Sequence, residues 1–198
     1  PSEVAPLNAF ILAEIIDDIG FPPGVFNLVS GSAGKIGADM TGNPTVRKLT
    51  FTGSTEVGRI LMRQAADQIM KTSMELGGNA PFIVFDDADL DKAVDGAMIA
   101  KYRNGGQTCV CANRIYVQSG VYDAFAEKLK IAVAALQVGD GFEPGTTTGP
   151  LISEAALDKV LNHIKDALAK GATIICWWPA RKPSARSRLC SGLKPSKR

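Results

Sequence analysis

Strand-like and helix-like segments alternate along almost the whole chain, and this alternation limits the possible folds more than any other feature. Apolar residues recur at helical spacing in the segments 6–19, 35–40, 57–70, 90–101, 122–136 and 154–170. Short apolar runs between them predict strands at 25–29, 46–51, 72–76, 82–85, 114–118 and 172–176. Strands that alternate with helices predict parallel pairing through helical crossovers, so we expect an α/β fold.

The composition narrows the classes of function. The 198 residues are 45% hydrophobic and 21% charged, with a net charge of +2, which is typical of a globular protein. No apolar run is long enough to span a membrane, and we expect no signal peptide. Four unevenly spaced cysteines favour a reducing compartment, the cytoplasm or the mitochondrial matrix. We expect no metal. The single histidine, His163, excludes a zinc site built from several histidines. The acidic segment around Lys92 resembles the start of a calcium-binding loop, but such a loop needs glycine where Lys92 stands and glutamate where Met98 stands.

Residues 103–114, Arg-Asn-Gly-Gly-Gln-Thr-Cys-Val-Cys-Ala-Asn-Arg, place a cysteine in a glycine-rich loop. No bulky side chain adjoins Cys109. Gly105 and Gly106 let the backbone approach a bound molecule and free N–H groups to meet a developing oxyanion. A thiolate in such a loop is a candidate nucleophile for covalent catalysis. The alternative is a buried structural thiol, because cysteine is among the residue types most often buried.

Two upstream segments bear on this choice. Residues 74–81, Met-Glu-Leu-Gly-Gly-Asn-Ala-Pro, place an acid directly before a glycine turn. Residues 51–59, Phe-Thr-Gly-Ser-Thr-Glu-Val-Gly-Arg, combine a strand end, a glycine turn and a helix start. In this order the three segments resemble the G-S-T-x-x-G, E-L-G-G and G-Q-x-C patterns of the aldehyde dehydrogenase superfamily. The resemblance covers about residues 1–176. The segment 82–89 and the Cys-Val-Cys spacing are most similar to the succinate-semialdehyde dehydrogenase branch.

This resemblance implies an aldehyde dehydrogenase-like α/β architecture in two incomplete parts. Residues 1–76 would be the second half of a Rossmann-like NAD(P)-binding domain, and residues 77–176 the first part of the catalytic α/β domain. Because the chain starts at Pro1 without methionine, we expect an internal fragment. Full-length relatives are implied to be homodimers or homotetramers.

Residues 177–198 are expected to be an aberrant, disordered basic tail. The family continues with two glycines where Trp177 and Trp178 stand here, and TGGTGG read one base later encodes Gly-Gly. A single-base frameshift therefore accounts for the tryptophans and for the change in composition after them. The alternative is a basic tail for nucleic acid or membranes. No aromatic or helical spacing organises its charges, so we expect neither partner.

The resemblance implies NAD(P)-dependent oxidation of a small-molecule aldehyde to a carboxylic acid. Cys109 would form a thiohemiacetal and then a thioester. Glu75 is implied as the general base for the water that hydrolyses the thioester. The alternative for Glu75 is a surface glutamate in a turn.

The cofactor residues are also implied by the resemblance. Gly53 and Gly58 would let a pyrophosphate approach a helix N-terminus, and Ser54 would bond a phosphate oxygen. Leu76 is implied to lie at the cofactor. Glu3 would lie by the adenosine ribose, where a carboxylate repels a 2′-phosphate, so we expect NAD or NADP with NAD slightly favoured.

Arg103, six residues before Cys109, is implied to bind the distal carboxylate of the substrate, for which guanidinium geometry is suited. A simple ion pair with an Asp or Glu is the alternative. We therefore expect succinate semialdehyde as the substrate of the intact enzyme and an inactive isolated fragment. A different aldehyde, or a non-catalytic remnant, is the alternative. Cys111 is a candidate redox partner that forms a reversible disulfide with Cys109, unless it is a small packing residue.

Overall fold

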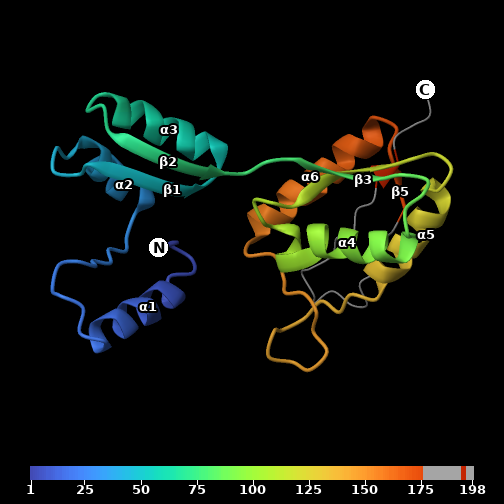
Figure 1. The fold of residues 1–198 in the computed structure, drawn as a ribbon, viewed down its shortest axis with the longest axis horizontal. Coiled ribbons are helices and arrows are strands. Elements are labelled where there is room, and N and C mark those ends of the chain that lie inside the picture. The colour runs from blue at the N-terminus through green and yellow to red at the C-terminus, as the bar shows by residue number, and fades with distance from the viewer. Residues whose placement is uncertain (176–192, 195–198) are drawn as a thin grey trace. The chain divides into compact units, whose positions relative to one another are not determined.

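The computed structural model describes residues 1–175 and 193–194 and divides into two compact units, Pro1–Gly77 and Gly78–Arg198 (Figure 1). In each unit a parallel pair of strands carries helices, which confirms the predicted α/β class. The double tryptophan and most of the tail predicted to be disordered lie outside the described residues. We call the two parts unit 1 and unit 2.

Unit 1 is built on the strands β1 (Lys48–Gly53) and β2 (Lys71–Leu76). They pair in parallel, and the last pair of the ladder joins Gly53 to Leu76. The crossover helix α3 (Thr55–Ala66) lays the buried side chains of Leu61 and Ala65 against this pair. The shorter helix α2 (Ala33–Gly42) packs beside α3.

The first thirty residues of unit 1 contain one helix, α1 (Leu7–Asp18). It lies within the predicted segment, and Gly20 follows it with the left-handed φ of 74° typical of a helix end. The strand predicted at 25–29 is wrong. This segment has no regular structure, and Val25 and Val29 are 64% and 61% exposed. A strand needs a neighbour for its backbone bonds, and none of the described strands pairs with these residues.

Unit 2 begins with the parallel strands β3 (Ala80–Val84) and β4 (Ala112–Val117). The helices α4 (Leu90–Tyr102) and α5 (Tyr122–Ala134) pack on one face of this pair. Their common core contains Val84, Val94, Ala97 and Phe125, each at most 6% exposed. Ile83 points to the other face and is 57% exposed, as the two-residue period of a strand requires.

The rest of unit 2 contains the helix α6 (Glu154–Ala169) and the two-residue strand β5 (Thr173–Ile174). β5 pairs antiparallel with β6 (Leu193–Lys194). Of the strand predicted at 172–176, Thr173 and Ile174 are confirmed, while Ala172 and Ile175 lie outside β5. No helix among the described residues is long and apolar enough to cross a membrane.

Candidate active site

The loop between α4 and β4, residues 102–112, carries Cys109 and turns sharply after the helix. Its first part is the short 3₁₀ turn η1 (Arg103–Gly106). Asn104, Gly105 and Gly106 all have left-handed φ values, of 53°, 63° and 76°. Such values strain any residue with a Cβ, although asparagine tolerates them better than most. At Gly106 a Cβ would also lie 3.0 Å from the carbonyl oxygen of Lys101. The loop therefore requires glycine at this position.

The two cysteines of this loop lie in different environments. Cys109 is exposed, whereas Cys111 is 2% exposed and belongs to the core. The Cys111 sulfur lies 2.8 Å from the Thr108 hydroxyl oxygen, and its thiol donates to the Lys101 carbonyl at 3.8 Å. This geometry favours the alternative of a packing residue. A disulfide with Cys109 would require Cys111 to leave the core. The switch stays a prediction, which peroxide inactivation of the intact enzyme and of its Cys111→Ala variant would test.

Arg103 lies where α4 ends and η1 begins, and its side chain is exposed. None of the ion pairs formed by the described residues includes Arg103. The alternative of a simple surface ion pair thus has no support within the part of the chain that the structure describes. A guanidinium without an acidic neighbour beside a nucleophile loop is suited to binding a carboxylate ligand.

A hydrogen-bonded group at the base of the loop was not predicted. The ammonium of Lys101 donates to Asn113 Oδ1 at 2.7 Å, which joins the residue before the loop to the residue after it. The sequence contained one hint that the pairing beside this group is irregular. Pro81 in β3 has no N–H, so it cannot donate to a regular ladder with β4.

The turn from β1 into α3 is the predicted cofactor turn. Ser54 is the N-cap of α3, and its hydroxyl oxygen accepts from the Val57 amide at 3.2 Å. The amides of Thr55 and Glu56 have no acceptor within the described residues. Unpaired amides at a helix N-terminus suit an anion such as a phosphate, and the Ser54 proton stays available for donation.

The two glycines of this turn make room for side chains of unit 1 itself. A Cβ on Gly53 would collide with the ring of Phe51, and one on Gly58 would lie 2.7 Å from Leu76 Cδ2. Neither glycine has a left-handed φ. The family resemblance implied that these glycines admit a phosphate, which stays a prediction. The structure shows that Gly53 makes room for Phe51 and Gly58 for Leu76.

The two glutamates predicted as functional both lie in unit 1. Glu75 is exposed and is the second-last residue of β2, paired with Thr52 of β1. Glu3 is also exposed, and its Oε1 accepts the amide of Ala33, the first residue of α2, at 2.5 Å. One Glu3 oxygen is thus used at a helix N-terminus.

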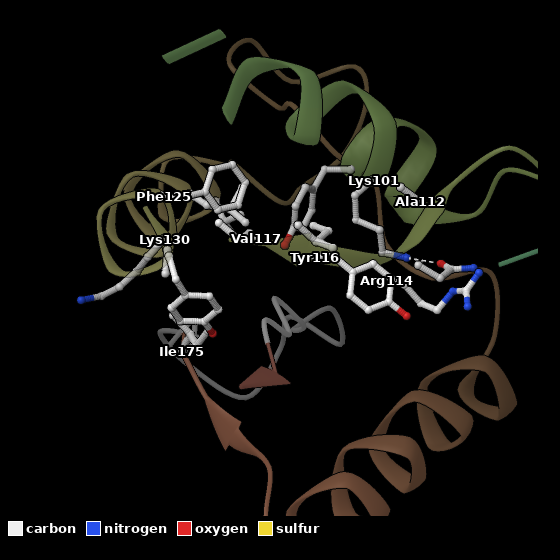
Figure 2. A pocket seen from close by; sticks show the side chains of 15 residues that line it. Lys101, Ala112, Arg114, Tyr116, Val117, Phe125, Lys130 and Ile175 are labelled. Atoms are coloured by element: carbon white, nitrogen blue, oxygen red, sulfur yellow. Dashed lines mark hydrogen bonds between the residues drawn. The ribbon is translucent and has the colours of Figure 1, made fainter. Parts of the chain in front are cut away.

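Unit 2 contains a pocket of about 380 Å³ beside β4 and α5 (Figure 2). Its lining is largely aromatic and aliphatic, with Tyr116, Phe125 and Ile175 among the contributing side chains. Neither Cys109 nor Arg103 is among the described residues that line it. No group of three or more His, Cys, Asp or Glu side chains among the described residues could hold a metal ion.

Comparison with known proteins adds three findings. The model of the aldehyde dehydrogenase family matches residues 1–187. Glutarate-semialdehyde dehydrogenase of Pseudomonas aeruginosa is 63% identical over 88% of this chain and 36% of its own length. Succinate-semialdehyde dehydrogenase [NADP(+)] of Escherichia coli is 63% identical over 89% of this chain and 36% of its own length.

Solved structures agree with the sequence relatives. A crystal structure of an Escherichia coli NADP-dependent enzyme has a TM-score of 0.89 and 61% identity, and the alignment covers 92% of this chain and 38% of that one. The chain thus spans little more than a third of the length of the relatives it matches.

Proposed function

This chain belongs to the aldehyde dehydrogenase family, and from that premise we propose that its residues serve NAD(P)-dependent oxidation of an aldehyde to a carboxylic acid. The best candidate substrates are short semialdehydes that carry a second carboxylate, with succinate semialdehyde first. The observation that carries the proposal is the exposed Cys109 on a left-handed glycine loop, with Arg103 six residues before it.

In the proposed reaction the Cys109 thiolate attacks the aldehyde carbon and forms a thiohemiacetal. A bound nicotinamide supplies the hydride acceptor. The oxidised intermediate on Cys109 is a thioester, which water hydrolyses to release the acid and the free thiol. Glu75, at the end of β2, takes a proton from that water. The loop glycines leave nearby backbone N–H groups free to stabilise the oxyanion of the tetrahedral intermediates.

We propose that the cofactor phosphates bind at the N-terminus of α3. The supporting observations are the unpaired amides of Thr55 and Glu56 and the hydroxyl of Ser54. We keep NAD as the slightly favoured cofactor because Glu3 would repel a 2′-phosphate. The Escherichia coli relative is named for NADP(+) instead. Comparing kcat/KM for the two cofactors in the intact enzyme and in its Glu3→Gln variant tests this preference.

Because the chain spans about a third of its relatives' length, we propose that it turns over little or no aldehyde on its own. Its residues are best tested in a graft, in which residues 1–175 replace the aligned segment of the Escherichia coli relative. We expect the graft to reduce NAD(P) with succinate semialdehyde. A folded graft without this activity would contradict the proposal.

Arg103 sets the proposed substrate class. In the graft, Arg103→Ala should raise KM for succinate semialdehyde about ten- to hundred-fold, since a hydrogen bond to a charged group contributes about 1.5–3 kcal/mol. KM for an uncharged aldehyde of similar length should change little. Equal effects on both substrates would show that Arg103 is structural. Glutarate semialdehyde is the second candidate, because a relative named for it is 63% identical.

We propose the cytoplasm or the mitochondrial matrix as the compartment, and homodimers or homotetramers as the assembly of the intact enzyme. Cell fractionation and sedimentation of the full-length protein test these two points.

A further inference from the structure

We infer that Asn113 is a positioning residue that clamps the base of the loop carrying Cys109 and ties it to Gly78 and Asn79. The effect of this clamp on catalysis rests on the proposed function. The clamp itself is a structural claim about unit 2, and the chain alone can test it.

Asn113 is placed by an irregularity in the β3–β4 pair. Ala80 pairs with Ala112, but the next residue, Pro81, pairs with Arg114. Asn113 is therefore the extra residue of a β-bulge. Pro81 has no N–H to give to a regular ladder, so the pair loses little at this position. A bulge changes the direction of a side chain, and bulges are frequent beside active sites.

Every polar atom of the Asn113 amide has a partner. Its Nδ2 donates to the Gly78 carbonyl at 3.1 Å and to Asn79 Oδ1 at 3.0 Å. Its Oδ1 accepts from Lys101 Nζ at 2.7 Å, the bond drawn as a dashed line from Lys101 in Figure 2. One side chain thus joins three chain segments: its own, that of Lys101, and that of Gly78 and Asn79. No side chain without two donors and an acceptor can make these contacts.

The three segments are those that carry the proposed chemistry. Lys101 precedes the nucleophile loop and Asn113 follows it, so their bond closes the loop at its base. The carbonyl oxygen of Lys101 also accepts a hydrogen bond from the Cys111 thiol. The same oxygen would lie 3.0 Å from a Cβ on Gly106. Gly78 and Asn79 come shortly after Glu75 along the chain. Asn113 therefore restrains the loop that carries Cys109 and ties it to Gly78 and Asn79, the first residues of unit 2.

A comparable amide at the other end of the same strands provides a matched control. Gln118 Oε1 accepts the amide of Asp86 at 2.8 Å and so ties the far ends of β3 and β4. Gln118 is not part of the nucleophile loop. Gln118→Met therefore removes a side-chain bond from the same strand pair, as Asn113→Leu does, but away from Cys109.

The first experiment uses the 198-residue chain and an arginine-specific protease. Cleavage of the bond after Arg103 needs the loop to open, and its rate follows the open population. Loss of a hydrogen bond should raise that population, so we expect cleavage about two- to ten-fold faster in Asn113→Leu. Lys101→Met should behave alike, because it removes the donor of the same bond. Gln118→Met should be cleaved at the parent rate, with a similar urea midpoint.

Equal cleavage of Asn113→Leu and the parent, or equally fast cleavage of Asn113→Leu and Gln118→Met, would overturn the clamp. If Asn113→Leu does not fold, Lys101→Met decides the question in the same way. In the active graft, Asn113→Leu should lower kcat with little change in KM, while Gln118→Met leaves both unchanged. A graft inactive in its parent form would count against the proposed function alone, because the protease result stands independently of it.

Discussion

Gly58 and Gly106 both lie near a junction between a helix and a strand. Gly58 is in the first turn of α3, directly after β1, and Gly106 is in the loop between α4 and β4. Their physical reasons for being glycine differ. Gly58 has an ordinary backbone and leaves space for the side chain of Leu76. Gly106 has a φ of 76° and faces a backbone carbonyl. Glycine at position 58 is thus required by side-chain packing, which can adapt to a substitution. Glycine at position 106 is required by backbone geometry, which cannot adapt.

We expect the largest loss of stability when a methyl group is added at Gly106. Gly106→Ala should destabilise unit 2 by about 2 kcal/mol, because alanine is strained at this φ and its Cβ meets the Lys101 carbonyl oxygen. Hydrogen exchange in residues 101–112 measures the effect. Trimming the Lys101 side chain should not relieve it, since the obstacle is backbone. Relief by Lys101→Ala would show that the side chain, and not the φ, excludes alanine.

The corresponding change in unit 1 should be smaller and reversible. Gly58→Ala should cost about 1–2 kcal/mol, because the methyl group overpacks against the end of the Leu76 side chain. In a Leu76→Ala background the same change should cost almost nothing, which a double-mutant cycle on exchange in residues 55–66 would reveal. Additive costs would mean that Leu76 is not what Gly58 accommodates.

Substitutions of Asn104 distinguish backbone strain from a side-chain contact as the reason for asparagine in this loop. Its φ of 53° is left-handed, and its side chain is exposed. Asn104→Ala should therefore cost about 1 kcal/mol, and Asn104→Gly distinctly less. Urea unfolding followed by circular dichroism compares the two variants. If glycine is as costly as alanine at this position, a contact of the asparagine side chain, and not backbone strain, explains the residue.

The helices next to the two turns should differ in their response to acid. Asp89 is the N-cap of α4, whereas Ser54, which does not titrate, is the N-cap of α3. The backbone N–H of Lys92, followed by its side chain, holds the pKa of Asp89 below its ordinary value of 3.8. A lowered folded-state pKa contributes stability above pH 3.8 that is lost as the pH falls through the folded-state value.

Exchange protection of α4 should accordingly decrease slightly in that acid range. Asp89→Asn keeps a capping side chain without a titrating group, so it should remove this part of the pH dependence. An unchanged acid response in Asp89→Asn would assign the effect to other carboxylates.

Much of this molecule follows from local sequence. Hydrophobic period and turn residues predicted α4 from Leu90 and α6 from Glu154 at the residues where they begin. The start of α4 is also fixed locally, because Asp89 Oδ1 accepts the amides of Asp91 and Lys92. The segment 25–29 had the composition of a strand, but strand formation depends on a neighbour that composition does not reveal.

The contacts that sequence analysis did not predict depend on the register in which the strands pair. Which side chain fills the space at Gly58 follows from the pairing of Gly53 with Leu76 across β1 and β2. The clamp at Asn113 follows from a one-residue bulge between β3 and β4. Neither can be inferred from residues close in sequence. The burial of Cys111 beside the exposed Cys109 is also a result of packing, since the two share a loop and a residue type.

Cys109, and not Cys111, is the proposed nucleophile. The most direct test compares Cys109→Ser and Cys111→Ser in the graft, by following reduction of NAD(P) with succinate semialdehyde and trapping the acyl-enzyme for mass spectrometry. We predict that Cys109→Ser abolishes both turnover and the acyl adduct, and that Cys111→Ser retains both with the adduct on Cys109. Turnover that persists in Cys109→Ser, or an adduct found on Cys111, would contradict the account.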